Sequence, residues 1–228
     1  MIENYFYLIW AVCFFIIYLV LFILRKDVRR EMIFVGLLFG FAGLASEYIH
    51  IKDWWAPVTI TGTPLGIEDF LIGLAIGGVA AVLYEEVYKK RIRKSKKAHF
   101  YTKLCLTILS AAGIFYINFY LFHLHSFYSA VLTFVVPTLV LLIMRRDLIK
   151  DSFMSGLFLW AIGVLFYLSL YLILPDLFNR FWYLPDEWFS TFILGIPLAE
   201  HIWYFLAGMF IGPLYEFWQE GRLVKSKK

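Results

Sequence analysis

Long apolar stretches alternate with short charged segments along the whole chain. A helix needs about 20 apolar residues to cross a hydrocarbon core roughly 30 Å thick, because it rises about 1.5 Å per residue. Seven stretches reach this length: 5–24, 32–50, 66–88, 100–122, 126–144, 153–174 and 197–218. The pattern predicts an all-α polytopic membrane protein, a bundle of seven spans.

The basic residues gather in four segments, and their distribution predicts the orientation of the spans. The segments after the first, third, fifth and seventh spans, with the first turn of the fourth, hold 19 of the 21 Lys and Arg residues. Only Lys52 and Arg180 remain for the opposite side. Cytoplasmic loops carry an excess of Lys and Arg. We therefore expect a multi-pass protein of the cell membrane, with the N-terminus outside and the C-terminus in the cytoplasm.

Composition agrees with a membrane location and excludes other classes. Hydrophobic residues make up 62% of the chain, whereas a soluble domain is nearer half apolar. The net charge of +4 does not indicate a nucleic-acid partner, because the basic residues follow the predicted topology, and membrane lipids are the expected surroundings. Cys13 and Cys105 lie in apolar runs and support neither a disulfide nor a zinc site.

The chain also resembles itself. Residues 24–40, LRKDVRREMIFVGLLFG, align with 144–160, MRRDLIKDSFMSGLFLW, and residues 66–85 align with 197–216, both ending in Leu-Tyr-Glu. The first three spans would then recur as the last three, and the single span between them would give both copies the same direction. We expect two parallel three-helix repeats joined by a connecting helix, with an active or binding site between the halves. The expected boundaries are 1–98, 99–125 and 126–228.

Small residues and acids share one stripe in the third and seventh predicted spans. Two Gly-x-x-x-Gly pairs occur, Gly73 with Gly77 and Gly208 with Gly212. Such faces let helix backbones approach closely in lipid. Asp69 lies one helical turn before Gly73, and Glu200 lies two turns before Gly208. We therefore expect both carboxyl groups to point into the bundle.

Ionisable groups inside membrane spans are costly and usually functional. Most acids fall near the predicted cytoplasmic surface among Lys and Arg, where we expect salt bridges and solvation: Asp27, Glu31, Glu85, Asp147, Asp151, Glu216 and Glu220. Four acids remain in the outer half: Glu47, Glu68, Asp69 and Glu200. Complementation of the helix dipole explains an acid in a first helical turn. It does not explain why both copies carry the acid on the same stripe.

Four histidines are also expected on the outer side: His50, His123, His125 and His201. Together with the outer acids they could form a metal site. They contain no His-x-x-x-His spacing, so interfacial histidines are the better interpretation, and we predict no metal and no cofactor. The chain also lacks a phosphate-binding loop, a dinucleotide fingerprint and a Gly-x-Ser-x-Gly elbow, and the last span has no lysine for retinal.

Two three-span modules, each with a short acidic motif opening its third helix, resemble the integral-membrane lycopene cyclase family. The family motif has the form Pro-x-Glu-Glu/Asp, and here it reads GIED at 66–69 and PLAE at 197–200. The sequence GPLYEFW at 212–218 adds to the resemblance, which covers nearly the whole chain. The chain departs from the motif at Gly66, in place of proline, and at Ala199, in place of the first acid.

The resemblance implies a cofactor-independent enzyme of carotenoid biosynthesis that closes end rings on a lipid-soluble polyene such as lycopene. An acid would protonate the terminal double bond, the cation would attack along the chain, and a base would remove a proton. A carboxyl group in a low-dielectric pocket can stay protonated, and a nearby carboxylate can act as base. The implied catalytic residues are Glu68, Asp69 and Glu200, with Glu68 or Glu200 as the acid and Asp69 as the base.

Residues beside these acids are expected to bind the substrate: Glu47, Phe70, His201, Trp203 and Tyr204. Aromatic faces stabilise a passing cation. Four further tryptophans fall in predicted outer loops, where an interfacial belt is the simpler interpretation: Trp54, Trp55, Trp182 and Trp188.

Three alternatives remain open at this point. The first is a carotenoid hydratase or another acid-driven polyene enzyme, in which water captures the cation. The second is a non-catalytic carotenoid-binding or structural membrane protein, which the loss of an acid at Ala199 would favour. The third is a metal-dependent membrane hydrolase that uses the outer histidines. The exact carotenoid, the ring type and the oligomeric state are not indicated by the sequence.

Overall fold

The computed structural model describes residues 5–93 and 101–225 of the chain. Five of the basic residues used to predict the orientation lie outside these ranges: Lys94, Lys96, Lys97, Lys227 and Lys228. The expected boundary between the first repeat and the connecting helix, at residue 98, also lies outside them.

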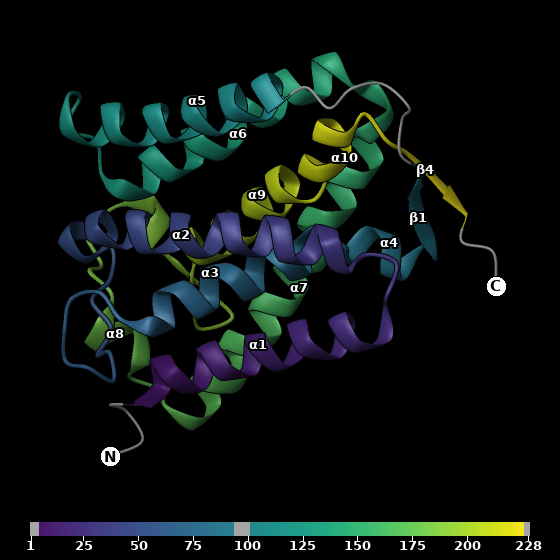
Figure 1. The fold of residues 1–228 in the computed structure, drawn as a ribbon. Coiled ribbons are helices and arrows are strands. Elements are labelled where there is room, and N and C mark those ends of the chain that lie inside the picture. Colours follow the sequence, from purple (N-terminus) through teal and green to yellow (C-terminus); the bar gives the residue numbers. More distant parts are fainter. Residues whose placement is uncertain (1–4, 94–100, 226–228) are drawn as a thin grey trace. The chain divides into compact units, whose positions relative to one another are not determined.

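The described chain is mostly helical (Figure 1). Its long helices are α1 (Phe6–Leu24), α2 (Arg29–Asp53), α5 (Tyr101–Tyr120), α6 (Ser126–Met144) and α7 (Ile149–Ile173). Its shorter helices are α3 (Ile67–Ala80), α4 (Leu83–Val87), α8 (Leu177–Phe181), α9 (Leu198–Ile211) and α10 (Leu214–Gln219). The short strands are β1 (Lys90–Arg93), β2 (Phe192–Ile193), β3 (Ile196–Pro197) and β4 (Arg222–Lys225), and single 3₁₀ turns cover Arg146–Leu148 and Trp188–Ser190.

Five helices of the described chain are long and apolar enough to cross a membrane. They are α1, α2, α5, α6 and the run Arg146–Ile173 that contains α7. Length and apolar composition therefore indicate a multi-pass membrane protein, as the sequence predicts.

The third and seventh predicted spans, 66–88 and 197–218, are not single helices. α3 ends at Ala80 and α4 begins at Leu83, whereas α9 ends at Ile211 and α10 begins at Leu214. The second break has a clear cause, because Pro213 has no backbone N–H and cannot continue the ladder of α9. The chain resumes helical pairing directly afterwards, where Phe217 N–H donates to the Pro213 oxygen (2.9 Å). No proline marks the first break, so the sequence carries no local signal for it.

Helix lengths recur at fixed distances along the chain. α1 and α6 both contain 19 residues and begin 120 residues apart, at Phe6 and Ser126. α2 and α7 both contain 25 residues and also begin 120 residues apart. α3 and α9 both contain 14 residues and begin 131 residues apart. These two distances equal the offsets between the aligned sequence segments of the two halves.

The chain divides into two compact units. The first comprises Met1–Val79 with Ala161–His201, and the second comprises Ala80–Trp160 with Ile202–Lys228. In the first unit, α2 and α3 approach through glycines. A Cβ atom added to Gly43 would lie 2.8 Å from the backbone oxygen of Asp69, and one added to Gly36 would lie 2.9 Å from that of Leu74. This close approach holds the first turn of α3, with its two acids, against α2.

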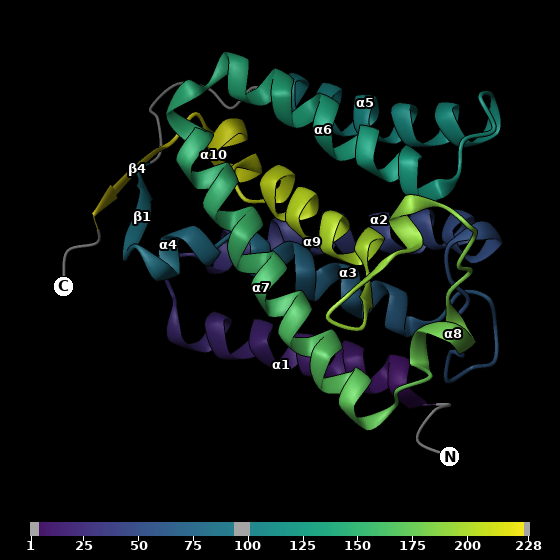
Figure 2. The same ribbon diagram turned by 180° about the vertical axis from the view of Figure 1, so that it is seen from behind.

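The second unit has its own helix and strand pairs. α5 and α6 lie side by side in both views (Figures 1 and 2). β1 and β4 pair antiparallel, with Lys90 opposite Lys225 and Arg93 opposite Arg222. α9 packs closely on α7, because a Cβ atom added to Gly208 would lie 2.6 Å from the Ser155 oxygen. The close approach predicted for the Gly208 face is therefore present.

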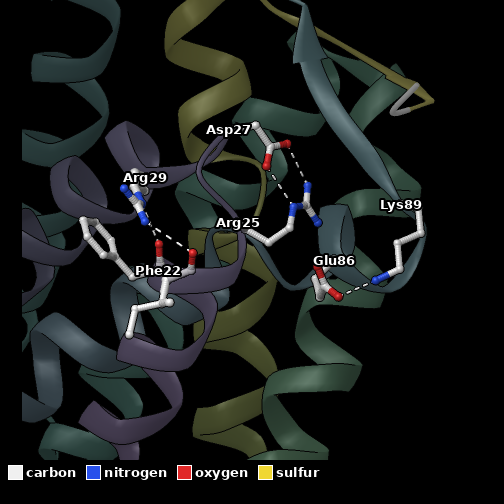
Figure 3. A network of polar contacts seen from close by, with 7 residues as sticks. Phe22, Arg25, Asp27, Arg29, Glu86 and Lys89 are labelled. Atoms are coloured by element: carbon white, nitrogen blue, oxygen red, sulfur yellow. Dashed lines mark hydrogen bonds and ion pairs between the residues drawn. The ribbon is translucent and has the colours of Figure 1, made fainter. Parts of the chain in front are cut away.

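Some acids expected near the cytoplasm form the salt bridges that the sequence predicts. Arg25 donates to both carboxylate oxygens of Asp27 (2.9 Å each), and Glu86, an acid outside the predicted group, pairs with Lys89 (Figure 3). Figure 3 also shows Arg29, whose Nε donates to the Phe22 oxygen (2.6 Å) and so satisfies a carbonyl near the end of α1. Asp147 and Glu220 also form predicted salt bridges, with Arg145 and Lys103 respectively.

Four other acids of that group contradict the expectation of solvation. Glu31, Glu85, Asp151 and Glu216 are buried. Asp151 illustrates the cause: it lies one turn before Ser155, and Ser155 is on the face of α7 that packs against α9. Basic neighbours in the sequence suggested solvent contact, but the helix face turns these carboxyl groups inward.

We predict that Gly208→Ala destabilises the protein. The added methyl group would force α7 and α9 apart, and overpacking of this kind typically costs about 1–3 kcal/mol. The measurement is the apparent melting temperature of the purified protein in detergent. Gly113→Ala is the control, because a Cβ atom at Gly113 in α5 meets nothing within 4 Å. Equal melting temperatures for the two variants would contradict the close contact.

Candidate functional site

The four acids predicted in the outer half all belong to the first unit, and all are buried. Their exposed fractions are 5% for Glu47, 0% for Glu68, 3% for Asp69 and 6% for Glu200. A buried carboxyl group is costly unless hydrogen-bond donors surround it. The identity of those donors therefore defines the site.

Three aromatic side chains donate to Glu200 in the first turn of α9. Trp54 Nε1 and Trp182 Nε1 donate to Oε1, at 3.0 and 2.8 Å, and the Tyr167 hydroxyl donates to Oε2 (2.8 Å). Trp54 follows α2, Trp182 follows α8, and Tyr167 belongs to α7. Residues from three separate elements thus fix the position of one carboxyl group.

Asp69, in the first turn of α3, is held by two donors. The backbone N–H of Gly66 donates to Oδ2 (2.7 Å), which satisfies one of the free N–H groups at the helix start. The Tyr7 hydroxyl donates to Oδ1. Helix capping accounts for the first contact only. The second brings a residue of α1, 62 positions away in the chain, to the same carboxyl group.

Glu68 contacts the loop that precedes α3. Its Oε1 accepts from the backbone N–H of Ile60 (2.6 Å). Thr59, the neighbour of Ile60, closes the same loop by donating to the Thr63 oxygen (2.6 Å). A side chain at Gly66 would collide with Thr59, since its Cβ atom would lie 2.8 Å from that of Thr59. The loop therefore needs glycine where the family motif has proline, and Glu68 holds the loop in place.

Glu47 lies near the end of α2 and is also partnered by tryptophan. Trp55 Nε1 donates to its Oε2 (3.2 Å), and His50 Nδ1 lies 3.8 Å from the same oxygen. The outer interface alone does not explain Glu47, because the side chain is buried with an indole donor.

Aromatic rings connect the donors of Asp69 to those of Glu200. The ring of Tyr7 lies 4.9 Å from that of Trp55, and Trp55 lies 5.1 Å from Trp182. Trp10 lies 5.5 Å from Trp55 and 5.1 Å from Tyr167. We call Glu47, Asp69 and Glu200, with Tyr7, Trp10, Trp54, Trp55, Tyr167 and Trp182, the carboxyl–aromatic network. It combines proton-transferring groups with ring faces that can stabilise a cation.

Backbone pairing explains how the tryptophans reach the network. The Ala56 N–H donates to the Phe181 oxygen, and the Tyr183 N–H donates to the Trp54 oxygen, both at 2.8 Å. Trp55 and Trp182 form the bridge between these two loop segments. The prediction of an interfacial belt is therefore wrong for Trp54, Trp55 and Trp182, which are buried, whereas Trp188 is exposed.

The predicted substrate-binding residues other than Glu47 have ordinary packing contacts. The Phe70 ring packs 5.3 Å from Phe41, and His201 Nε2 lies 3.1 Å from the Ile193 oxygen. Trp203 and Tyr204 belong to the second unit, where Trp203 packs 5.8 Å from Phe134. Their roles toward a substrate stay predictions.

The outer histidines are not brought together as metal ligands. His125 caps α6 by accepting from the Phe127 N–H (3.1 Å). Within residues 5–93 and 101–225, the group of three side chains close enough to share an ion contains carboxylates alone and none of these histidines. The metal-dependent hydrolase stays a prediction.

Comparison with known proteins gives one match. Residues 125–218 match the family model of lycopene cyclase. This segment is similar to the lycopene cyclase family, and we call it the lycopene cyclase domain. No curated protein and no solved structure matches the chain.

The lycopene cyclase domain contains one part of the carboxyl–aromatic network. It begins at His125, the cap of α6, and ends at Trp218 in α10, so it includes Glu200 with its donors Tyr167 and Trp182. The resemblance that the sequence suggests is thereby confirmed for this segment. The donors Tyr7, Trp54 and Trp55 lie before it in the chain.

We predict that Tyr167→Phe lowers the stability of the protein. The change keeps the ring but removes the donor to Glu200 Oε2, and a buried group that loses its partner typically costs about 1–3 kcal/mol. The measurement is again the apparent melting temperature in detergent. Tyr183→Phe is the matched control, because Tyr183 is exposed. If the two variants have the same melting temperature, the hydrogen bond from Tyr167 does not stabilise Glu200.

Proposed function

We propose that this chain is a lycopene cyclase-like membrane enzyme that closes carotenoid end rings by acid–base isomerisation without a cofactor. One observation carries the proposal: Asp69 and Glu200 are two buried carboxyl groups joined through a cluster of aromatic rings. Membership of residues 125–218 in the lycopene cyclase family supports the choice of a polyene such as lycopene as substrate.

The chemistry requires one proton donor and one proton acceptor around an apolar chain. A carboxylic acid gives a proton to the terminal double bond, and the resulting carbocation is attacked by a nearby double bond, which forms the ring. A carboxylate then removes a proton from a carbon beside the new cation. Atoms and electrons balance, because one proton enters and one leaves, so the product is an isomer of the substrate. Asp69 and Glu200 supply the two groups, and the aromatic rings stabilise the cation between the steps.

Glu68 is better explained as a positioning residue than as a third catalytic acid. It bonds the backbone of the loop before α3, and in the sequence alignment of the two halves its counterpart is Ala199. The chain enters α9 through the β2–β3 pair, with Phe192 opposite Pro197, and not through a loop of the first kind. The missing acid at Ala199 is therefore compatible with catalysis by Asp69 and Glu200.

We also propose the arrangement that the sequence predicts around this site. It consists of seven spans, with an outside N-terminus, and two parallel three-helix repeats over 1–98 and 126–228 joined by a connecting helix. The equal lengths and constant offsets of the paired helices support the repeat. In this arrangement α3 with α4, and α9 with α10, each form one interrupted span, and both acids lie toward the outer face.

The first test is expression in a bacterium that accumulates lycopene. We expect wild-type protein to yield a cyclic product of unchanged mass. Membranes incubated with preformed, unlabelled lycopene in heavy water should give a product with one deuterium per ring. Glu200→Gln should lower product formation at least about 100-fold, the usual contribution of a general acid or base. Glu187→Gln, an exposed acid, is the control.

The same experiment separates the alternatives. A product heavier by one water molecule would identify a hydratase. Unchanged pigment that co-purifies with abundant protein would identify a carotenoid-binding protein. Acyclic pigment alone, with no difference between wild type and Glu200→Gln, would refute the proposed cyclase.

A second test distinguishes the positioning role of Glu68 from a catalytic role. Glu68→Gln keeps an oxygen that can accept from the Ile60 N–H, so we expect it to retain at least about half of the activity. Asp69→Asn should lose about 100-fold, because an amide neither donates nor removes a proton in this way. Initial rates per milligram of membrane protein give the comparison. Equal losses for Glu68→Gln and Asp69→Asn would assign Glu68 to the chemistry.

A further inference from the structure

A second group of buried acids lies in the second unit, and none of its members belongs to the carboxyl–aromatic network. Glu85 of α4, Asp151 of α7 and Glu216 of α10 are each at most 1% exposed. One oxygen from each carboxyl group lies within 4.8 Å of the other two. We call these three residues the acidic triad.

Asp151 gives the most direct indication that the triad holds a ligand. Its Oδ1 accepts a hydrogen bond from Ser155 Oγ (3.1 Å). Its Oδ2 is buried and has no hydrogen-bond partner among the described residues. A carboxylate oxygen in such a position is costly unless a cation or a proton neutralises it.

Basic side chains also lie near the triad. Lys90 and Glu85 are the charged groups that act on Asp151, the first attracting and the second repelling. Lys90 Nζ also donates to the Tyr84 hydroxyl (2.8 Å). Arg145 lies near Glu216 and donates to its backbone oxygen (3.4 Å), but its charge is paired with Asp147 through bonds of 2.8 and 2.7 Å. One ammonium group, that of Lys90, and one further carboxyl group, that of Glu85, therefore act on Asp151.

The separation of the oxygens suits one metal ion. Hard divalent cations bind carboxylate oxygens at about 2.0–2.6 Å, so two oxygens on one ion lie no more than about 4–5 Å apart. The three triad oxygens all lie within 4.8 Å of one another, which is inside the range set by the longer metal–oxygen distances. An all-carboxylate set selects Mg²⁺, Ca²⁺ or Mn²⁺ over metals that prefer nitrogen or sulfur.

We propose that Glu85, Asp151 and Glu216 bind one hard divalent cation that ties α4, α7 and α10 together. The ion supplies the missing partner of Asp151 Oδ2. Its role is structural, because it joins two short helices to a long one at the point where each short helix follows a break. This proposal does not depend on the proposed cyclase activity.

The test uses the full-length protein in detergent, first stripped with EDTA and then equilibrated with Mg²⁺, Ca²⁺ or Mn²⁺ alone. We expect about one ion per chain by elemental mass spectrometry, and a higher melting temperature with the ion than with EDTA. Asp151→Asn removes one charge at nearly constant shape. It should bind the ion at least tenfold more weakly and lose the thermal shift.

Two further variants keep the proposal falsifiable. Asp147→Asn, which removes an acid paired with Arg145 outside the triad, should bind the ion like wild type. If Asp151→Asn does not fold, Glu216→Gln takes its place. The proposal is overturned if wild type retains no ion at millimolar concentration, or if the triad variants bind as well as wild type. A melting temperature that responds to pH but to none of the three ions would also overturn it and would show that the acids share protons.

Discussion

The arrangement of the first unit depends on one constraint: a carboxyl group removed from water must be given hydrogen-bond donors. Glu200 is the clearest case, since two indoles and one phenol donate to its two oxygens. These donors provide an N–H or O–H group and at the same time an apolar ring. A lysine or arginine would satisfy the same oxygens but would place a full positive charge where the proposed reaction forms a carbocation. Aromatic donors avoid that repulsion. The same side chains therefore satisfy the buried carboxyl group and suit the proposed carbocation chemistry.

This constraint also explains the path of the chain around the site. Trp54 and Trp182 can meet at one oxygen because the loop segments after α2 and α8 pair through their backbones. Asp69 can lie in the same unit because Gly43 lets the first turn of α3 rest on α2. Loss of either feature would leave a buried acid without its donors. The glycines and the paired loops therefore position the buried acids and their donors, although they have no chemical role in the proposed reaction.

The sequence predicts the long helices and the acids at the starts of α3 and α9 because each leaves a local signal. A run of 20 apolar residues or an acid at a fixed distance from a Gly-x-x-x-Gly pair is visible in one dimension. The tryptophan donors leave no such signal. The sequence around Trp54 and Trp55 is the same whether their loop faces the membrane interface or folds over a carboxyl group. The backbone pairing of this loop with residues 181–183, which the sequence does not reveal, determines that it folds over the carboxyl group. Likewise, Asp151 lies near Arg145, Arg146 and Lys150 in the sequence, which suggests solvent, whereas the helix face that it shares with Ser155 turns it inward.

The difference between the two acidic motifs follows from the different loops that precede them. A loop from Thr59 to Gly66 precedes the first motif. Glu68 anchors this loop, because its carboxyl group accepts a hydrogen bond from the Ile60 N–H. The second motif follows a two-strand turn, in which the Leu198 N–H donates to the Thr191 oxygen (2.8 Å), so the backbone closes the turn by itself. An acid at Ala199 would then be a buried carboxyl group with no loop to hold. The proposed ring closure takes up one proton and releases one, so it needs two acids, and Asp69 and Glu200 are the pair that the two motifs share. The substitution at 199 thus removes a structural contact that the second motif does not need, and it leaves in place both carboxyl groups to which we assign proton transfer.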